Sequence, residues 1–139
     1  MSGEVPSFAT LEREAGQSYA PAKGDKWPLE EWYDSVRQLP ITQLPAGDLA
    51  KACRQNVWID QVVPVAVEVL KNDPQAGELY DGELVVALKS ILPGFWLQHT
   101  ATATALQVIV ERAMPEFDED VRAHATELLS QLVNSTRNP

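Results

Sequence analysis

The sequence predicts an all-α protein, folded as an irregular bundle of six to seven short helices in a single domain. Ten prolines divide the 139 residues into pieces of helical length. Within these pieces apolar residues recur at spacings of three and four, which is the period of an amphipathic helix. The chain is long enough for one domain, and its 45% hydrophobic content provides for one core without disulfides or metals.

The N-terminal part, residues 1–26, is expected to be a segment with one short helix near residues 7–14. A loop is expected to follow it through Asp25, in a segment that mixes Gly, Pro, Ser and Lys. Residues 27–139 are expected to form the main helical domain.

The first helix of this domain is predicted over residues 29–39. Pro28 falls in its first turn, where proline is tolerated, and Pro40 is expected to end it. A second helix is predicted over residues 46–56. Its apolar residues recur every fourth position and line one face, namely Leu49, Cys53 and Val57.

Residues 62–71 are apolar almost all round, with Glu68 as the main exception. A helix of this kind is expected in the middle of the domain, covered on several sides. Its valines also fit a buried strand, and periodicity does not separate the two in so short a run. Pro64 near the start, together with the Ala and Leu residues, favours the helix.

Asn72-Asp73-Pro74 is a strong stop, and the loop after it is expected to include residues 77–82. The next helix is predicted over residues 83–92. Pro93-Gly94 is expected to interrupt the helical structure again.

A further helix is predicted over residues 99–114, although the alternating Thr and Ala at its start imitate a strand. Pro115 is expected to end it. The apolar residues of the last helix step by four, four, three and four: Phe117, Val121, Ala125, Leu128 and Leu132. Acidic residues in its first turn interact favourably with the helix dipole.

The net charge of −9 comes from 20 acidic and 11 basic residues. It argues against nucleic acid and anionic membranes as partners, because phosphate binding is driven by Lys and Arg. The charge fits two interpretations, solubility alone or a basic protein partner. The first 24 residues lack the pattern of a signal peptide, and a single cysteine excludes an intramolecular disulfide. A cytoplasmic protein is therefore expected.

The sequence contains few residues or motifs that point to catalysis. Both Gly-rich phosphate-binding motifs are absent. Asp120 and His124 are spaced to meet on one helix face, where a surface ion pair is favoured over a metal site. Cys53 is expected to be a small buried hydrophobe rather than a nucleophile. We therefore expect no catalysis, metal or cofactor, although an acidic-site hydrolase remains as an alternative.

The four tryptophans are expected mainly in the core. Trp58 and Trp96 lie among apolar residues. Trp27 and Trp32 flank an acidic helix start, where core packing is favoured over a role in an interface.

Five sequence elements occur in a recognisable order between residues 7 and 96. They are SFATLE at 7–12, LPAGDLAKACRQ at 44–55, VPVAVEVL at 63–70, DPQAGELYDGEL at 73–84 and FW at 95–96. Their order and spacing resemble the immunity proteins of bacterial contact-dependent growth-inhibition (CDI) systems. The resemblance ends at Trp96, beyond which two further helices are expected.

This resemblance implies a cytoplasmic antidote of the toxin–antitoxin kind. Such a protein binds the cognate C-terminal toxin domain of a CDI protein, here expected to be a basic nuclease, and covers its active site. A monomer in a 1:1 complex is expected. The alternative function is a non-catalytic helical adaptor or protein-interaction module.

Elements shared within such a family should mainly encode the fold, because each member faces its own toxin. The loop at 77–84 is therefore expected to be a structural turn. In it Gly82 supplies a backbone conformation that other residues resist, and Asp81 or Glu83 starts the next helix. Toxin-binding candidates are the acids outside the shared elements: Glu30, Glu31, Asp34, Glu116, Asp118, Glu119 and Asp120. The alternative is that these acids only stabilise helix starts.

Overall fold

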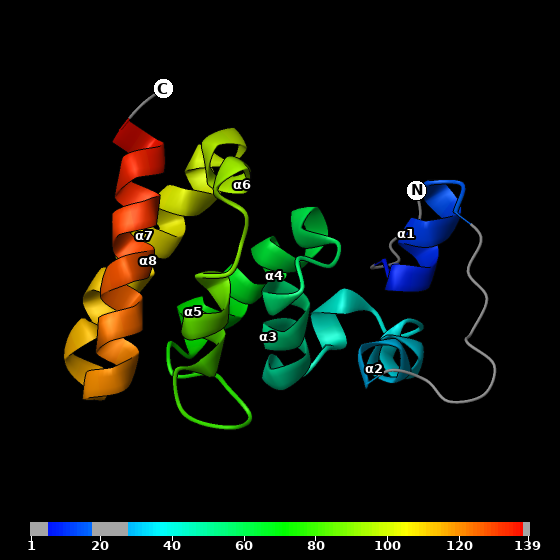
Figure 1. The fold of residues 1–139 in the computed structure, drawn as a ribbon, viewed down its shortest axis with the longest axis horizontal. Helices are drawn as coiled ribbons and strands as arrows, with labels where there is room; N and C mark the ends of the chain where they lie inside the picture. The colour runs from blue at the N-terminus through cyan, green and yellow to red at the C-terminus, as the bar shows by residue number, and fades with distance from the viewer. Residues whose placement is uncertain (1–5, 18–27, 138–139) are drawn as a thin grey trace. The chain divides into compact units, whose positions relative to one another are not determined.

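The computed structural model describes residues 6–17 and 28–137 of the chain. These residues form eight α-helices and two 3-10 helices and contain no strand, which confirms the all-α prediction (Figure 1). The chain divides into two compact units, Met1–Leu44 and Pro45–Pro139. The domain boundary expected between residues 26 and 27 lies outside the described residues, as do the loop expected through Asp25 and Trp27.

Unit 1 contains α1 (Phe8–Glu14), α2 (Pro28–Val36) and the 3-10 helix η1 (Ile41–Gln43). Ser7 caps α1, since its Oγ accepts a hydrogen bond of 3.1 Å from the backbone N–H of Thr10. The helix predicted over residues 29–39 ends three residues early, at Val36. Leu39 precedes a proline and is disfavoured in a helix, so the chain turns before it, and Pro40 precedes η1 instead.

The core of unit 1 joins α1 to α2 through aromatic rings and one buried carboxylate. Phe8 stacks on Tyr33 with ring centroids 5.4 Å apart and meets Trp32 edge-on at 6.3 Å. Trp32 is only 9% exposed, which confirms its assignment to the core. Glu12 is buried and accepts hydrogen bonds from Tyr33 Oη at 2.6 Å and from Arg37. Burial acts to raise the pKa of Glu12, but these two donors and the charge of Arg37 outweigh it, so the pKa is lowered.

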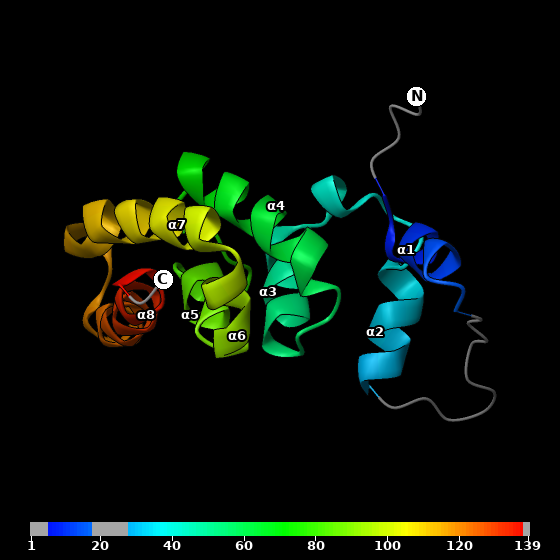
Figure 2. The same cartoon turned by 90° about the horizontal axis from the view of Figure 1, so that it is seen from above.

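Residues 45–137 of unit 2 contain six α-helices and one 3-10 helix. They are α3 (Ala46–Arg54), α4 (Ile59–Asn72), α5 (Glu83–Leu88), α6 (Pro93–Gln98), α7 (Thr100–Ala113), η2 (Met114–Glu116) and α8 (Glu119–Arg137). Figure 2 shows α4 and α7 along one side of this unit and α3, α5 and α8 along the other. Helix contacts within and between the two layers enclose the core. Its largest fully buried side chains include Leu49, Leu70, Leu84, Trp96, Leu106, Leu128 and Leu132.

Several helix boundaries in unit 2 differ from the predicted ones, and one helix, α6, was not predicted. The helix predicted from residue 62 begins at Ile59, because Trp58 adopts a left-handed conformation (φ +45°) and precedes the first turn. The helix predicted over residues 83–92 ends at Leu88. The interruption predicted at Pro93-Gly94 is wrong: Pro93 occupies the first turn of α6, where its missing N–H is not needed.

Helix α4 buries one face rather than its whole circumference. Val62, Val63, Ala66, Val67 and Leu70 are buried, but Pro64 and Glu68 are exposed. Helix α4 packs against α3, α5 and α7. These neighbours cover its buried face, but the opposite face is exposed, so the cover expected on several sides is limited to the buried face. Within the described ranges, no helix is both long and apolar enough to span a membrane.

Candidate functional site

A buried carboxylate fixes the loop between α4 and α5, residues 73–82. Glu83 is the first residue of α5 and is only 1% exposed. Its Oε1 accepts hydrogen bonds from the backbone N–H groups of Glu78 (2.8 Å) and Leu79 (3.1 Å), and its Oε2 accepts one from Arg54 Nη1 (3.2 Å). Burial acts to raise the pKa of Glu83, but the two N–H donors and Arg54 outweigh it, so the pKa lies below its ordinary value.

Gly82 brings the end of this loop against α8. Its φ is +91°, a conformation that residues with a side chain rarely adopt. A Cβ at this position would lie 2.7 Å from Cγ1 of Val121. The prediction that Gly82 supplies a special backbone conformation is confirmed, as is the prediction that Asp81 or Glu83 starts the next helix.

The start of the loop is bound to the connection between α7 and α8. Gln75 Nε2 donates a hydrogen bond of 2.6 Å to the backbone carbonyl of Glu116. The backbone N–H of Gly82 donates to the carbonyl of Gln75 at 2.8 Å, which closes the loop on itself. Two segments far apart in sequence, 73–82 and 116–121, are thereby held side by side.

Two large apolar side chains remain at the surface of this loop. Leu79 is 76% exposed and Tyr80 is 45% exposed. Tyr80 lines an open pocket together with residues of α8 and its cap, namely Asp118, Asp120, Val121 and His124. In Figure 1 the loop, drawn in green, extends below α5.

Four of the predicted site residues lie at or just before the start of α8, and two of them, Asp118 and Asp120, line this pocket. Glu116 lies in η2, Asp118 precedes α8, and Glu119 and Asp120 form its first turn; all four are exposed. Asp118 caps the helix, because its Oδ1 accepts a hydrogen bond of 2.8 Å from the backbone N–H of Val121. Asp118 therefore stabilises the start of α8, which is the alternative role expected for these acids.

Three further exposed acids belong to the α4–α5 loop itself and were missed by the sequence interpretation. They are Asp73, Glu78 and Asp81. With Glu116, Asp118, Glu119 and Asp120 they form what we call the acidic rim, and neither contributing segment contains Lys or Arg. The acids on either side of Leu79-Tyr80 in the sequence could have identified them as a candidate binding surface. They were missed because the loop was interpreted as a structural turn.

The other predicted cluster belongs to unit 1. Glu30 and Glu31 are exposed in the first turn of α2. Asp34 is half-buried, and after Glu12 its charge contributes to raising the pKa of Arg37. This carboxylate therefore already interacts with a cation of its own unit.

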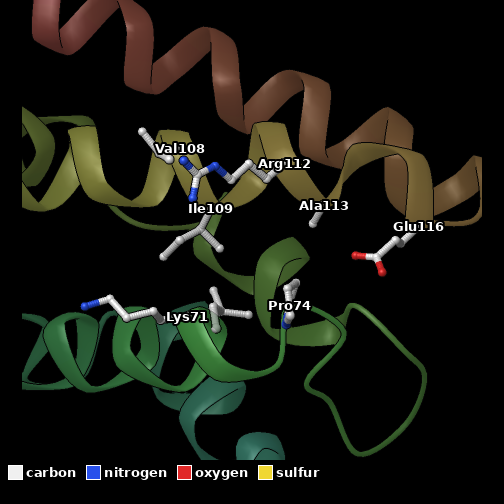
Figure 3. A pocket seen from close by; sticks show the side chains of 8 residues that line it. Lys71, Pro74, Val108, Ile109, Arg112, Ala113 and Glu116 are labelled. Atoms are coloured by element: carbon white, nitrogen blue, oxygen red, sulfur yellow. The ribbon is translucent and has the colours of Figure 1, made fainter.

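A second pocket of unit 2 lies between α4 and α7 and has a different character (Figure 3). Its centre is apolar, with Ile109 pointing from α7 towards α4. Lys71, Arg112 and Glu116 contribute charges to its lining. Because two of these three charges are positive, the pocket is a poorer match for a basic partner than the acidic rim.

The sequence offers two candidates for metal-binding or nucleophilic chemistry, the Asp120/His124 pair and Cys53. No cluster of three or more His, Cys, Asp or Glu suited to a metal occurs in this part of the chain. His124 Nδ1 lies 2.7 Å from Lys89 Nζ, so its polar contact is with a lysine, although it shares a pocket with Asp120. Cys53 is fully buried, and burial raises its pKa to about 12, which confirms a buried hydrophobe.

A family model described as CDI immunity proteins matches residues 14–121, which is more than half of the chain. The match extends past Trp96 through α7 to the first turn of α8, so the resemblance does not end where the sequence elements suggested. A search of curated proteins found no match. The chain therefore belongs to the family of CDI immunity proteins, whose role is immunity against a CDI toxin.

Proposed function

We propose that this immunity protein neutralises a nuclease toxin by covering its active site with carboxylates, as a monomer in a 1:1 complex and without catalysis. The toxin would be met in the cytoplasm of the attacked cell. The observation that carries this proposal is the acidic rim, exposed carboxylates on two segments that the packing of the α4–α5 loop on α8 holds side by side.

The physical basis is charge complementarity. A nuclease binds phosphates with Lys and Arg, so its active-site cleft presents positive charge. A protein of net charge −9 is attracted to such a cleft and repels the competing nucleic acid. Electrostatic steering can raise association rates to about 10⁸–10⁹ M⁻¹s⁻¹ at low salt, which favours inhibition before the toxin reaches its substrate.

The predicted acids of the rim are better candidates for toxin binding than the predicted acids of unit 1. In unit 1, Asp34 acts on Arg37, which leaves Glu30 and Glu31 as exposed carboxylates. In the rim, four predicted acids are joined by three more and by two exposed apolar side chains. Both clusters remain candidates, and because they lie in different units each is tested by itself.

The experiment uses the cognate C-terminal toxin domain and measures cleavage of a labelled nucleic acid. We expect activity to fall to zero at one equivalent of inhibitor, and excess nucleic acid to slow formation of the complex. A variant with Glu116→Gln, Asp118→Asn, Glu119→Gln and Asp120→Asn should inhibit far less well, since each lost pairing with a buried cation costs about 2–5 kcal/mol. Glu30→Gln/Glu31→Gln/Asp34→Asn tests the other cluster.

A charge-matched control removes four exposed acids outside both clusters: Glu14, Asp60, Glu68 and Glu111. This control should inhibit like the unmodified protein. A toxin with no activity on DNA or RNA would contradict the nuclease assignment. A stable complex that still binds and cleaves nucleic acid would contradict the covering of the active site.

A further inference from the structure

We infer that Leu79 and Tyr80 form an apolar anchor that inserts into the basic toxin domain, with the acidic rim pairing with the cations around the insertion site. This inference rests on the proposed function for the charge of the partner. It assigns the central contact to two residues of a loop that also has a structural role.

The first reason is exposure. Among the described residues, no large hydrophobic side chain is recorded as more exposed than Leu79, at 76%, and its neighbour Tyr80 is 45% exposed. Removing such surface from water is favourable, so a partner gains free energy by covering it. Tyrosine in particular is enriched among the residues that dominate binding energy.

The second reason is that hydrogen bonds fix the loop without using these two side chains. Glu83 binds the backbone N–H groups of Glu78 and Leu79, and Arg54 binds Glu83 in turn. Gln75 binds the carbonyl of Glu116, which attaches the other end of the loop. A loop that is already ordered loses little conformational entropy on binding, so its exposed side chains are efficient contacts.

The third reason is the charge around the anchor, which identifies the kind of partner. Asp118 and Asp120 line the pocket beside Tyr80, and Glu78 and Asp81 flank the pair in the sequence. Two copies of this chain meeting at this surface would bring like charges together. A basic protein with an apolar depression matches both the charge and the exposed side chains.

These observations divide the loop between two roles. Gly82 and Glu83 maintain its conformation, and their replacement would disturb the fold. Leu79 and Tyr80 contribute little to the core of unit 2, because most of the Leu79 side chain and nearly half of Tyr80 are exposed. Their replacement therefore tests binding while leaving the fold intact.

The experiment measures the affinity of the toxin domain for Leu79→Ala/Tyr80→Ala by calorimetry or surface-based kinetics. We expect the Kd to rise about 30-fold or more, mostly through faster dissociation, as for residues at the centre of an interface. The matched control is Leu92→Ala/Leu97→Ala, which removes two side chains of 60% and 54% exposure from the α5–α6 region. Its Kd should stay within about threefold of the unmodified value.

The outcomes separate this inference from the proposed function. If the unmodified protein does not bind the toxin domain, the proposed function fails. If it binds, and the rim variant is weakened while Leu79→Ala/Tyr80→Ala binds normally, the anchor alone is wrong. A dimer of the unmodified protein that Leu79→Ala/Tyr80→Ala converts to a monomer would assign this surface to self-association and overturn the anchor.

Discussion

The carboxylate of Glu83 lies 3.2 Å from Arg54 Nη1, which joins the first residue of α5 to the last residue of α3. The same carboxylate holds the α4–α5 loop, so one side chain connects two helices and the candidate binding loop. Replacement by glutamine should lower the free energy of unfolding by about 2 kcal/mol, because hydrogen bonds to a charged acceptor are lost or weakened. Chemical denaturation at neutral pH measures this difference.

The effect of Glu83→Gln should depend on pH. In the folded protein the pKa of Glu83 lies below its ordinary value of 4.5, so the unfolded chain takes up the proton first as the pH falls. The stability contributed by the ionised carboxylate is complete well above pH 4.5 and is lost as the pH falls through the folded pKa. The two proteins should therefore differ most near neutral pH and converge in acid. A constant difference between neutral pH and pH 3 would contradict this account.

Gly82→Ala should destabilise unit 2 by about 1–3 kcal/mol. The new Cβ would meet Val121 at 2.7 Å, and alanine resists a φ of +91°. Gly94→Ala is the matched control, because a Cβ there has nothing within 4 Å and the residue lies in α6, where alanine is the better helix former. Thermal unfolding of both variants gives the comparison, and equal melting temperatures would be evidence against close packing of the loop on α8.

Asp118 should show separate effects on stability and on binding. Asp118→Ala removes the cap of α8 and should cost about 1 kcal/mol of stability. Asp118→Asn keeps a capping oxygen, so it should alter stability by only a few tenths of a kcal/mol while removing the charge. If Asp118→Asn binds the toxin domain as tightly as the unmodified protein, the charge of this residue serves the helix alone.

Cys53 should be unreactive in the folded protein. Its side chain is fully buried and its pKa is raised to about 12, so almost no thiolate is present at pH 8. A thiol reagent should label it at the rate of unfolding, and rapidly once denaturant is added. Stoichiometric labelling within seconds under native conditions would show that this part of α3 opens readily.

Most of the helices could be predicted from sequence because their signals are local. The steps of three and four in α3, α7 and α8, together with the prolines that frame them, depend on neighbouring residues alone. The start of α4 could not be predicted, since it depends on Trp58 in a left-handed conformation that is unusual for a bulky residue. Helix α6 was missed because proline and glycine together were interpreted as a break.

The candidate site was less predictable, because it depends on contacts between distant segments. The acids at the start of α8 were identified from their position in the helix. Glu83 and Arg54 are separated by 29 residues, and Gln75 binds a carbonyl 41 residues away. No local pattern predicts such pairs, and without them the exposure of Leu79 and Tyr80 beside the rim could not be anticipated.

The most direct measurement is the affinity of the purified toxin domain for the unmodified protein and for Glu116→Gln/Asp118→Asn/Glu119→Gln/Asp120→Asn, at low and at high salt. Our account predicts a 1:1 complex whose affinity falls as salt increases. It predicts that the rim variant binds at least about 30-fold more weakly, with a melting temperature lowered only by the loss of the cap charge and the first-turn charges of α8. Equal affinities for both proteins, insensitive to salt, would contradict the claim that this surface binds the toxin.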